Sequence, residues 1–310
     1  MSINIGITGV IPPLVTPLTA ERELDAASLE RLVDTLVEAG VSALFVGGST
    51  GEVALLTDAQ RVEAVHVAVR AAAGRVPVFA GAIDTGTNRV IDHARRAVKA
   101  GAAAVVATPP FYVSPHPSEI IEHYHRIAAA VDAPVIAYDI PSAAHVSLPL
   151  PALAQLAQDG TIAALKDSSG DLAKFRAAIE LVRGTGIGML TGSEIFSDLA
   201  LQAGGTGLVP GLGNVDPDGY VAIQRLAEAH DWDGAAAQQR RLIRLFRIID
   251  VPDRSRIGFT AGALGAFKAA LYLRGVIDTP ATAAPFGALI DSEIQTIRTL
   301  LLEAGLQVAH

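Results

Sequence analysis

The sequence predicts an α/β protein built as a closed (β/α)₈ barrel with a C-terminal helical extension. Two observations predict this fold. Short apolar runs, rich in Val, Ile, Leu and Ala, alternate along the chain with longer amphipathic stretches, and continuous apolar runs are typical of parallel strands covered on both faces. Polar residues, glycines and prolines follow nearly every run, as expected where parallel strands end together at one rim.

Eight apolar runs are candidate strands. Eight strand–helix units without a long insertion favour closure into a TIM barrel over the alternative of an open, doubly wound sheet. The runs lie at residues 10–15, 43–46, 78–82, 103–107, 135–138, 163–165, 188–191 and 207–209.

The stretches between the runs carry helical patterning. Apolar residues recur at helical spacing from Leu29 to Val37, and Gly40 follows as a C-terminal stop. Residues 90–99 repeat this pattern and stop before Gly101. Beyond the eighth run, which ends near Asn214, four more helices are expected at residues 220–230, 235–249, 262–273 and 292–304. We therefore assign residues 1–230 to the barrel and residues 231–310 to the helical extension.

The composition argues against several functional classes. The chain has 310 residues, half of them hydrophobic, and a net charge of −8 that is spread along it, so no nucleic-acid partner is expected. It contains no cysteine, hence no disulfide and no thiolate site. The first ten residues lack a signal-peptide pattern, and no apolar run reaches the roughly 18 residues that span a bilayer. We expect a cytoplasmic protein without membrane contact.

Polar or conformationally special residues follow the runs and are expected to surround one mouth of the barrel, where active sites of this fold lie. They are Thr16-Pro17, Gly47-Gly48-Ser49-Thr50-Gly51-Glu52, Thr108-Pro109-Pro110-Phe111-Tyr112, Asp139-Ile140-Pro141-Ser142, Lys166-Asp167-Ser168-Ser169-Gly170-Asp171, Gly192-Ser193-Glu194 and Pro210-Gly211-Leu212-Gly213-Asn214.

Lys166 is the candidate nucleophile. It closes the sixth apolar run and is expected to point into or over the barrel. Burial removes water from the charged amine and favours the neutral form, which can attack a ketone to form an imine. The alternative is a lysine paired with Asp167 or Asp171 at the rim. The other three lysines are expected to be structural residues of helices: Lys99, Lys174 and Lys268.

The segment 47–52 is the second candidate feature. Its glycines allow a tight turn, and the hydroxyl and N–H groups of Ser49 and Thr50 suit an anion such as a carboxylate. The alternative is an ordinary turn in which Ser or Thr caps the next helix.

Two other kinds of site are alternatives: a metal site and a phosphate site. A metal site is not expected, because His123 and His125 are two residues apart on an expected helix and face different directions. His66 and His93 are expected in helices away from the strand ends. The glycine-rich ends of the seventh and eighth runs suit a phosphate, which makes a phosphate-binding or non-catalytic barrel the main alternative.

Together these motifs resemble the dihydrodipicolinate synthase/N-acetylneuraminate lyase family, whose members hold pyruvate-type keto acids as a Schiff base. The resemblance starts at residues 9–17 and reaches the C-terminal helices. Its most specific segments are Gly48-Ser49-Thr50-Gly51-Glu52, Tyr138-Asp139-Ile140-Pro141 and Leu165-Lys166-Asp167-Ser168-Ser169-Gly170-Asp171.

The resemblance implies catalytic and binding roles. Lys166 matches the Schiff-base lysine, and Tyr138 matches the tyrosine that shuttles protons. Ser49 and Thr50 match the pair that holds the carboxylate of the keto acid, and Ser49 also links Tyr138 to a second tyrosine.

The resemblance also implies how the site is completed. Tyr112 matches the second tyrosine, which in the family enters the site of a neighbouring subunit, and Val209 matches the residue whose backbone carbonyl lies beside the keto acid. We therefore expect a homo-oligomer, a dimer or tetramer, that acts on a small-molecule 2-keto acid. No cofactor is expected, because a protonated imine is itself an electron sink.

The branches of the family differ in the residues that bind the part of the substrate remote from the keto acid group. In the synthase branch an arginine follows the Pro-Ser of the tyrosine motif and clamps a carboxylate, whereas Ala143 follows Pro141-Ser142 here. Glu194 matches an acid that binds sugar hydroxyls in the sialic-acid lyase, although Ser193 replaces a second acid there; the alternative for Glu194 is an acid at a helix N-terminus.

We therefore expect a 2-keto-3-deoxy sugar acid or a related hydroxylated 2-keto acid as substrate. The alternative is 4-hydroxy-tetrahydrodipicolinate synthase activity. Aldol cleavage, dehydration and condensation all stay open at this point.

Overall fold

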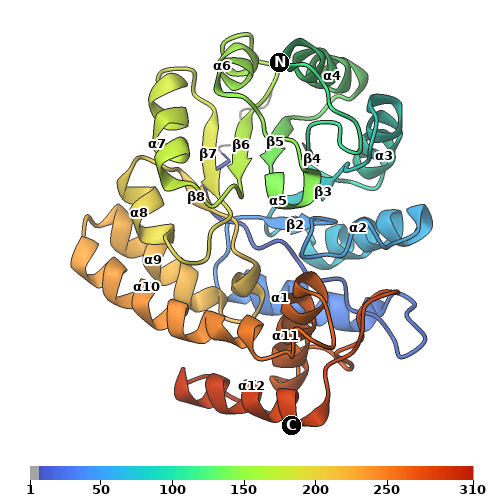
Figure 1. Cartoon of the computed structure of the whole chain (residues 1–310), viewed down its shortest axis with the longest axis vertical. Helices are drawn as coiled ribbons and strands as arrows, with labels where there is room; N and C mark the ends of the chain where they lie inside the picture. Colours follow the sequence, from blue (N-terminus) through green and yellow to red (C-terminus); the bar gives the residue numbers. More distant parts are fainter. Residues whose placement is uncertain (1–6, 310) are drawn as a thin grey trace.

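The computed structural model describes residues 7–309. Eight parallel strands form a ring at the centre, and helices surround it (Figure 1). The hydrogen-bonded order runs from β1 through β8 back to β2. The ring closes where Phe45 N–H donates to the Pro12 carbonyl at 3.0 Å and Leu14 N–H donates to the Phe45 carbonyl at 2.8 Å. The predicted barrel is confirmed.

The eight strands overlap the eight apolar runs of the sequence. They are β1 (Gly9–Val10), β2 (Leu44–Val46), β3 (Val78–Gly81), β4 (Ala104–Ala107), β5 (Val135–Asp139), β6 (Ala164–Asp167), β7 (Gly188–Thr191) and β8 (Gly207–Leu208).

Several helices between the strands begin at capping residues that the sequence supplies. Asp25 accepts a hydrogen bond from Ser28 N–H at the start of α1, and Thr57 forms a capping box with Gln60 at the start of α2. The barrel helices are α1 (Ala26–Glu38), α2 (Asp58–Ala72), α3 (Thr87–Lys99), α4 (Pro117–Ala130), α5 (Pro141–Ala144), α6 (Leu150–Gln158), α7 (Leu172–Leu181), α8 (Ser197–Gln202), the 3₁₀ turn η1 (Gly211–Asn214) and α9 (Pro217–Glu228).

The strand residues divide into two cores because successive side chains point to opposite faces. On β5, Ile136 and Tyr138 face the barrel interior, whereas Val135 and Ala137 pack against the surrounding helices. The same alternation on β6 turns Leu165 outward, so the next residue along the strand faces the barrel interior.

The C-terminal segment is helical, as predicted, and packs against the first and last barrel units (Figure 1). Its helices are α10 (Trp232–Phe246), η2 (Arg247–Asp250), α11 (Phe259–Leu273) and α12 (Asp291–Glu303). Leu271 and Leu301 from this segment join Leu32 of α1 and Tyr220 of α9 in one buried apolar cluster. The boundary expected between residues 230 and 231 falls in the turn between α9 and α10, and the division into two domains stays a prediction.

No helix within residues 7–309 is long and apolar enough to cross a bilayer. Residues 1–6, part of the stretch whose composition argues against a signal peptide, lie outside the described residues.

Candidate active site

Lys166 lies near the C-terminal end of β6 and points into the barrel, with 4% of its surface exposed. Apolar side chains surround it, one from or directly after each of the other strands: Ile11, Phe45, Phe79, Val106, Ile136, Leu190 and Val209. Its Nζ lies 4.0 Å from the centre of the Tyr138 ring and 4.8 Å from that of Phe45. Among residues 7–309 it forms no ion pair and no hydrogen bond.

The acids that follow Lys166 are engaged elsewhere. Asp167 Oδ1 accepts hydrogen bonds from the N–H and hydroxyl of Ser169, at 2.9 and 2.7 Å. Asp171 caps α7 by accepting from Lys174 N–H at 2.9 Å. The alternative of a rim lysine paired with either acid is therefore wrong. The Asp167 carboxylate bonds to the turn that follows it, and the Asp171 carboxylate caps α7.

Tyr138 stands directly beside Lys166, since the two residues are partners in the β5–β6 register. Its side chain is buried, and its hydroxyl lies 3.5 Å from Ser49 Oγ. The Phe45 ring meets the Tyr138 ring edge to face, with centres 6.3 Å apart. Contacts from β2, the loop after it and β6 therefore fix the Tyr138 ring over the Lys166 amine and its hydroxyl beside Ser49.

The glycines of the segment after β2 let two strand ends approach closely. Gly47 has φ +69°, and a Cβ on Gly81 of β3 would lie 1.9 Å from the Gly47 carbonyl oxygen. Thr16 Oγ1, from the loop after β1, donates to the Gly51 carbonyl at 2.8 Å. These contacts fix the loop that carries Ser49.

Ser49 and Thr50 do not cap a helix, because α2 begins at Asp58 and its cap is Thr57. The N–H groups of Ser49 and Thr50 donate to no acceptor within residues 7–309. Directly after β8, the carbonyl of Val209 receives no donor from the same residues. Free N–H groups next to hydroxyls suit an anionic ligand.

Glu52 ends this loop in a left-handed conformation, with φ 58°, and its carboxylate is buried. Oε1 accepts from Ala283 N–H at 2.7 Å. Oε2 forms an ion pair with Lys268 of α11. Lys268 Nζ also donates to the Ala281 carbonyl at 2.7 Å. The C-terminal extension thus holds the Ser49 loop through a buried charge pair.

Glu194, after β7, is partly buried, and its Oε1 accepts from Gly211 N–H at 2.9 Å. Its own carbonyl accepts from Gln239 Nε2 at 2.7 Å. Burial raises the pKa of the Glu194 carboxyl, against the opposing influence of the Gly211 N–H and the positive charge of Lys166. The carboxylate accepts from the first N–H of the 3₁₀ turn η1 and not from α8, which begins at Ser197, so the alternative of an acid at a helix N-terminus fits this contact.

Tyr112 is placed apart from the other candidates. Its backbone has φ 71°, and 94% of its surface is exposed in the single chain. The preceding Phe111 instead lines the cavity beside Ser49. The Pro-rich loop after β4 therefore turns one aromatic ring toward the barrel mouth and the next one outward.

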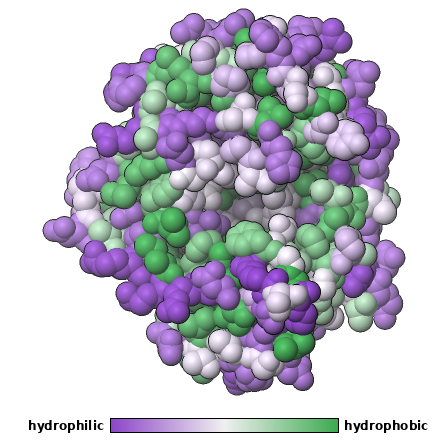
Figure 2. Space-filling view, in the orientation of Figure 1, coloured by the Kyte–Doolittle hydropathy of each residue, from purple (hydrophilic) through white to green (hydrophobic). Residues whose placement is uncertain are grey.

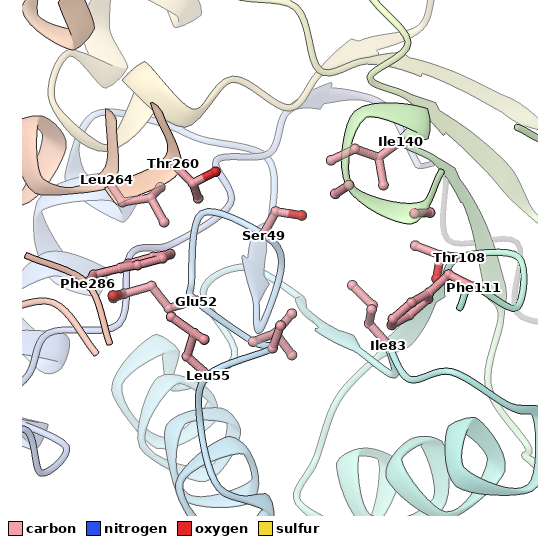
Figure 3. Close-up of a pocket in the computed structure, with 14 residues that line it drawn as sticks. Ser49, Glu52, Leu55, Ile83, Thr108, Phe111, Ile140, Thr260, Leu264 and Phe286 are labelled. Atoms are coloured by element: carbon pink, nitrogen blue, oxygen red, sulfur yellow. The ribbon is translucent and has the colours of Figure 1, made fainter. Parts of the chain in front are cut away.

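A cavity of about 200 Å³ opens beside Ser49 at the barrel mouth (Figure 3). Figure 2 shows a hollow near the centre of the corresponding face, bordered largely by pale and green residues. Its walls come from the Ser49 loop, the ends of β3, β4 and β5, and the C-terminal extension. Lys166 lies deeper, in the barrel interior.

Sequence reasoning missed the anchor of β5. Lys174 Nζ, from α7, lies 2.5 Å from Asp139 Oδ2 and 2.6 Å from Ser147 Oγ. Asp139 Oδ1 accepts from Leu148 N–H at 3.0 Å. These bonds hold the residue next to Tyr138. No local pattern signals them, because the partners come from separate elements.

Two histidines are structural. His123 of α4 is buried between the Thr87 hydroxyl, 2.9 Å from Nδ1, and the Thr108 carbonyl, 3.1 Å from Nε2. Burial lowers the His123 pKa to about 4. His93 Nε2 lies 2.9 Å from Asp84 Oδ2, directly beyond β3, so the expectation that His93 is remote from the strand ends is wrong. Within the described part of the chain no group of three or more His, Cys, Asp or Glu forms a metal site.

A (β/α)₈ barrel with a buried lysine on one strand, a tyrosine beside it on the next and a Ser-Thr loop opposite defines the class of Schiff-base lyases and aldolases. The comparisons with known proteins agree. The model of the dihydrodipicolinate synthetase family matches residues 6–304, and the chain belongs to this family. It is an enzyme of the lyase class.

Individual relatives cover from three quarters of the chain to nearly all of it. A DapA-like lyase of Halobacterium salinarum, itself uncharacterized, is 34% identical over 97% of this chain and 95% of its own. A 4-hydroxy-tetrahydrodipicolinate synthase of Stenotrophomonas maltophilia is 35% identical over 74% of this chain and 79% of its own. The structure of YagE from E. coli K12, a prophage protein of the dihydrodipicolinic acid synthase family in complex with pyruvate, superposes with a TM-score of 0.90 at 27% identity over 97% of this chain and 99% of that one.

The Glu52–Lys268 pair generates a stability prediction. Lys268→Met leaves the Glu52 carboxylate buried without a counter-ion, which costs about 3 to 5 kcal/mol of unfolding free energy. The double variant Lys268→Met/Glu52→Gln removes both charges and is expected to recover most of that loss. Denaturant unfolding midpoints of the wild type and both variants measure the effect. A single variant as stable as the wild type contradicts the role of the pair.

Proposed function

We propose that Lys166 forms an imine with C2 of a 2-keto acid and that the enzyme makes or breaks the bond between C3 and C4 of that acid. The observation that carries this proposal is the position of the Lys166 amine, held without a counter-ion under the faces of Tyr138 and Phe45. Ring faces attract cations, so they favour the positively charged imine that forms there.

The reaction balances without an added oxidant or reductant. The Lys166 amine adds to the C2 ketone, and water leaves as the protonated imine forms. Loss of the proton on the C4 hydroxyl then breaks the C3–C4 bond, the electron pair enters the imine to give an enamine, and C4 departs as an aldehyde. Protonation at C3 and hydrolysis release pyruvate and restore the amine. Condensation is the same sequence in reverse.

The surrounding groups match the needs of these steps. The free N–H groups of Ser49 and Thr50 suit the keto acid's carboxylate, and the free carbonyl of Val209 suits a hydrogen-bond donor on the bound intermediate. The Tyr138 hydroxyl, polarised by Ser49 at 3.5 Å, suits proton transfer at C2 and at the C4 oxygen. We assign catalysis to Lys166 and Tyr138 on this basis.

For the substrate, we propose a hydroxylated 2-keto acid, the class that includes the 2-keto-3-deoxy sugar acids. Glu194, the residue expected to meet substrate hydroxyls, follows β7, and its Oε1 is held by Gly211 N–H, after β8, at 2.9 Å. Members of this class share the head that forms the imine, and they differ beyond C4.

Two alternatives are less favoured. The synthase reaction needs a cation for the carboxylate of its aldehyde, and Ala143 supplies none at the position that lines the cavity. Phosphate binding after β7 and β8 is disfavoured because the Glu194 carboxylate already accepts from Gly211 N–H and would repel an anion there.

We further propose that the chain assembles as a dimer or tetramer in which Tyr112 reaches the Ser49 hydroxyl of a partner subunit. The exposed aromatic ring, held on a strained backbone at the rim of the site, supports this assignment. Tyr112 would then join Ser49 and Tyr138 in one chain of hydroxyl groups.

Imine formation is tested by incubating the protein with pyruvate and sodium borohydride, followed by intact-mass and peptide analysis. We expect one reduced pyruvate adduct per chain, on Lys166. Lys166→Ala is the control and should take up none. Modification of Lys174 or Lys268 in place of Lys166, or no adduct, would reject the assignment.

The role of Tyr138 is tested by Tyr138→Phe. Removal of the hydroxyl should lower kcat by about 10²-fold or more, because acid–base help is typically worth that much. Unfolding should change little, since the ring still packs against Phe45. Turnover near that of the wild type on a substrate that the enzyme accepts would show that another group moves the protons.

The assignment of Tyr112 is tested by co-expressing two variants that are each expected to be inactive. Tyr112→Ala and Lys166→Ala chains are each expected to be nearly inactive. Co-expressed, they should regain activity, because a hybrid contains one site with an intact Lys166 and a partner's intact Tyr112. Sedimentation of the wild type should show a dimer or tetramer. A fully active monomer, or hybrids without recovery, would contradict the proposal.

A further inference from the structure

The cavity beside Ser49 has walls that distinguish between substrates. We propose that the part of the substrate beyond C4 is apolar, an alkyl or aryl group, and that it binds in this cavity. The proposal rests on the proposed imine chemistry, and it selects within the hydroxylated 2-keto acids.

Aliphatic and aromatic side chains from five regions of the chain line the cavity, one of them Phe111 from the loop after β4 (Figure 3). Leu55 comes from the Ser49 loop, Ile83 from the end of β3, and Ile140 from the end of β5. Leu264 and Phe286 come from the C-terminal extension. Because these regions are separate in sequence, the apolar lining belongs to the assembled site and not to one hydrophobic segment.

The few polar groups of the lining leave little for a charged or polyhydroxylated tail. The Glu52 carboxylate is occupied by Lys268 and Ala283 N–H. Apart from Ser49, the remaining polar side chains are Thr108, whose buried Oγ1 has no hydrogen-bond partner, and Thr260. Among residues 7–309, no lysine or arginine lines the cavity. A tail carboxylate meets no cation, and each hydroxyl buried without a partner weakens binding by about 10-fold or more.

The size of the cavity suits a compact apolar group. An apolar protein cavity of about 150 Å³ is known to admit benzene, and this one holds about 200 Å³. A phenyl ring or a short branched alkyl chain therefore fits. The ring of a partner's Tyr112 would add an apolar wall and one hydroxyl without changing the charge of the lining.

The class of substrate is thus a 4-hydroxy-2-keto acid with an apolar substituent on C4. In the condensing direction it corresponds to pyruvate plus an apolar aldehyde. The Thr108 Oγ1 is buried and has almost no exposed surface, so apart from Ser49 and Thr260 the walls offer such a ligand contact mainly with carbon.

The test measures kcat/KM for condensation of pyruvate with matched aldehydes, using the intact full-length protein. Propanal, butanal, hexanal and benzaldehyde form the apolar series, while glyceraldehyde, erythrose and aspartate semialdehyde form the polar one. We expect kcat/KM to rise by about fourfold per added methylene until the cavity is full. Faster reaction with any polar aldehyde than with the best apolar one would overturn the proposal.

Matched variants test whether the preference for apolar aldehydes depends on the side chains that line the cavity. Leu264→Asn keeps the branched shape and the number of side-chain heavy atoms but replaces two methyl groups by an amide, and it should lower kcat/KM for hexanal and benzaldehyde by about 10-fold. Leu264→Met, of similar volume and apolar, should change it little. Leu55→Asn, at a partly exposed position, repeats the test if Leu264→Asn unfolds. Unchanged preference in both asparagine variants would also overturn the proposal.

Borohydride trapping of pyruvate distinguishes a failure of the proposed imine chemistry from a failure of the proposed apolar tail. It should stay complete in all three cavity variants, since none of their altered side chains lines the space around Lys166. Loss of trapping in the wild type would mean that the imine chemistry itself is wrong. Normal trapping together with a preference for polar aldehydes would reject only the apolar tail.

Discussion

Glu52 and Lys268 form the contact on which the geometry of the candidate site depends most. The pair is fully buried, and a buried charge tolerates little displacement because the loss of its partner leaves it desolvated. Glu52 also holds a left-handed backbone at the end of the Ser49 loop, a conformation that persists only where its surroundings enforce it. Helix α11 therefore fixes the loop from outside the barrel.

Lys166 and Lys268 are both buried, but their surroundings differ in charge. Lys268 faces a carboxylate and a carbonyl oxygen, which compensate its charge, although burial still lowers its pKa. Lys166 faces two aromatic rings and aliphatic side chains, and no acid pairs with it among residues 7–309. The first arrangement stabilises a fixed ion pair. The second leaves the amine free to bond to carbon.

The mouth of the barrel combines two kinds of surface. The first consists of unused backbone groups at Ser49, Thr50 and Val209, which suit the polar head of a keto acid. The second is the apolar cavity beside Ser49, which the C-terminal extension completes with Leu264 and Phe286. The extension thus supports the loop, through Lys268, and shapes the cavity next to it. A change in this segment is expected to alter both stability and substrate choice.

Local sequence patterns determined the barrel, its eight strands and the lysine, tyrosine and Ser-Thr motifs, because strand burial and strand-end polarity leave a periodic signal along the chain. Tertiary structure alone decided which charges compensate one another. Asp139 with Lys174 and Glu52 with Lys268 are contacts between separate elements, and no spacing in the sequence encodes them. The same holds for the cavity, whose walls come from distant segments. A motif places a residue on its element, whereas contacts across the fold decide what that residue meets.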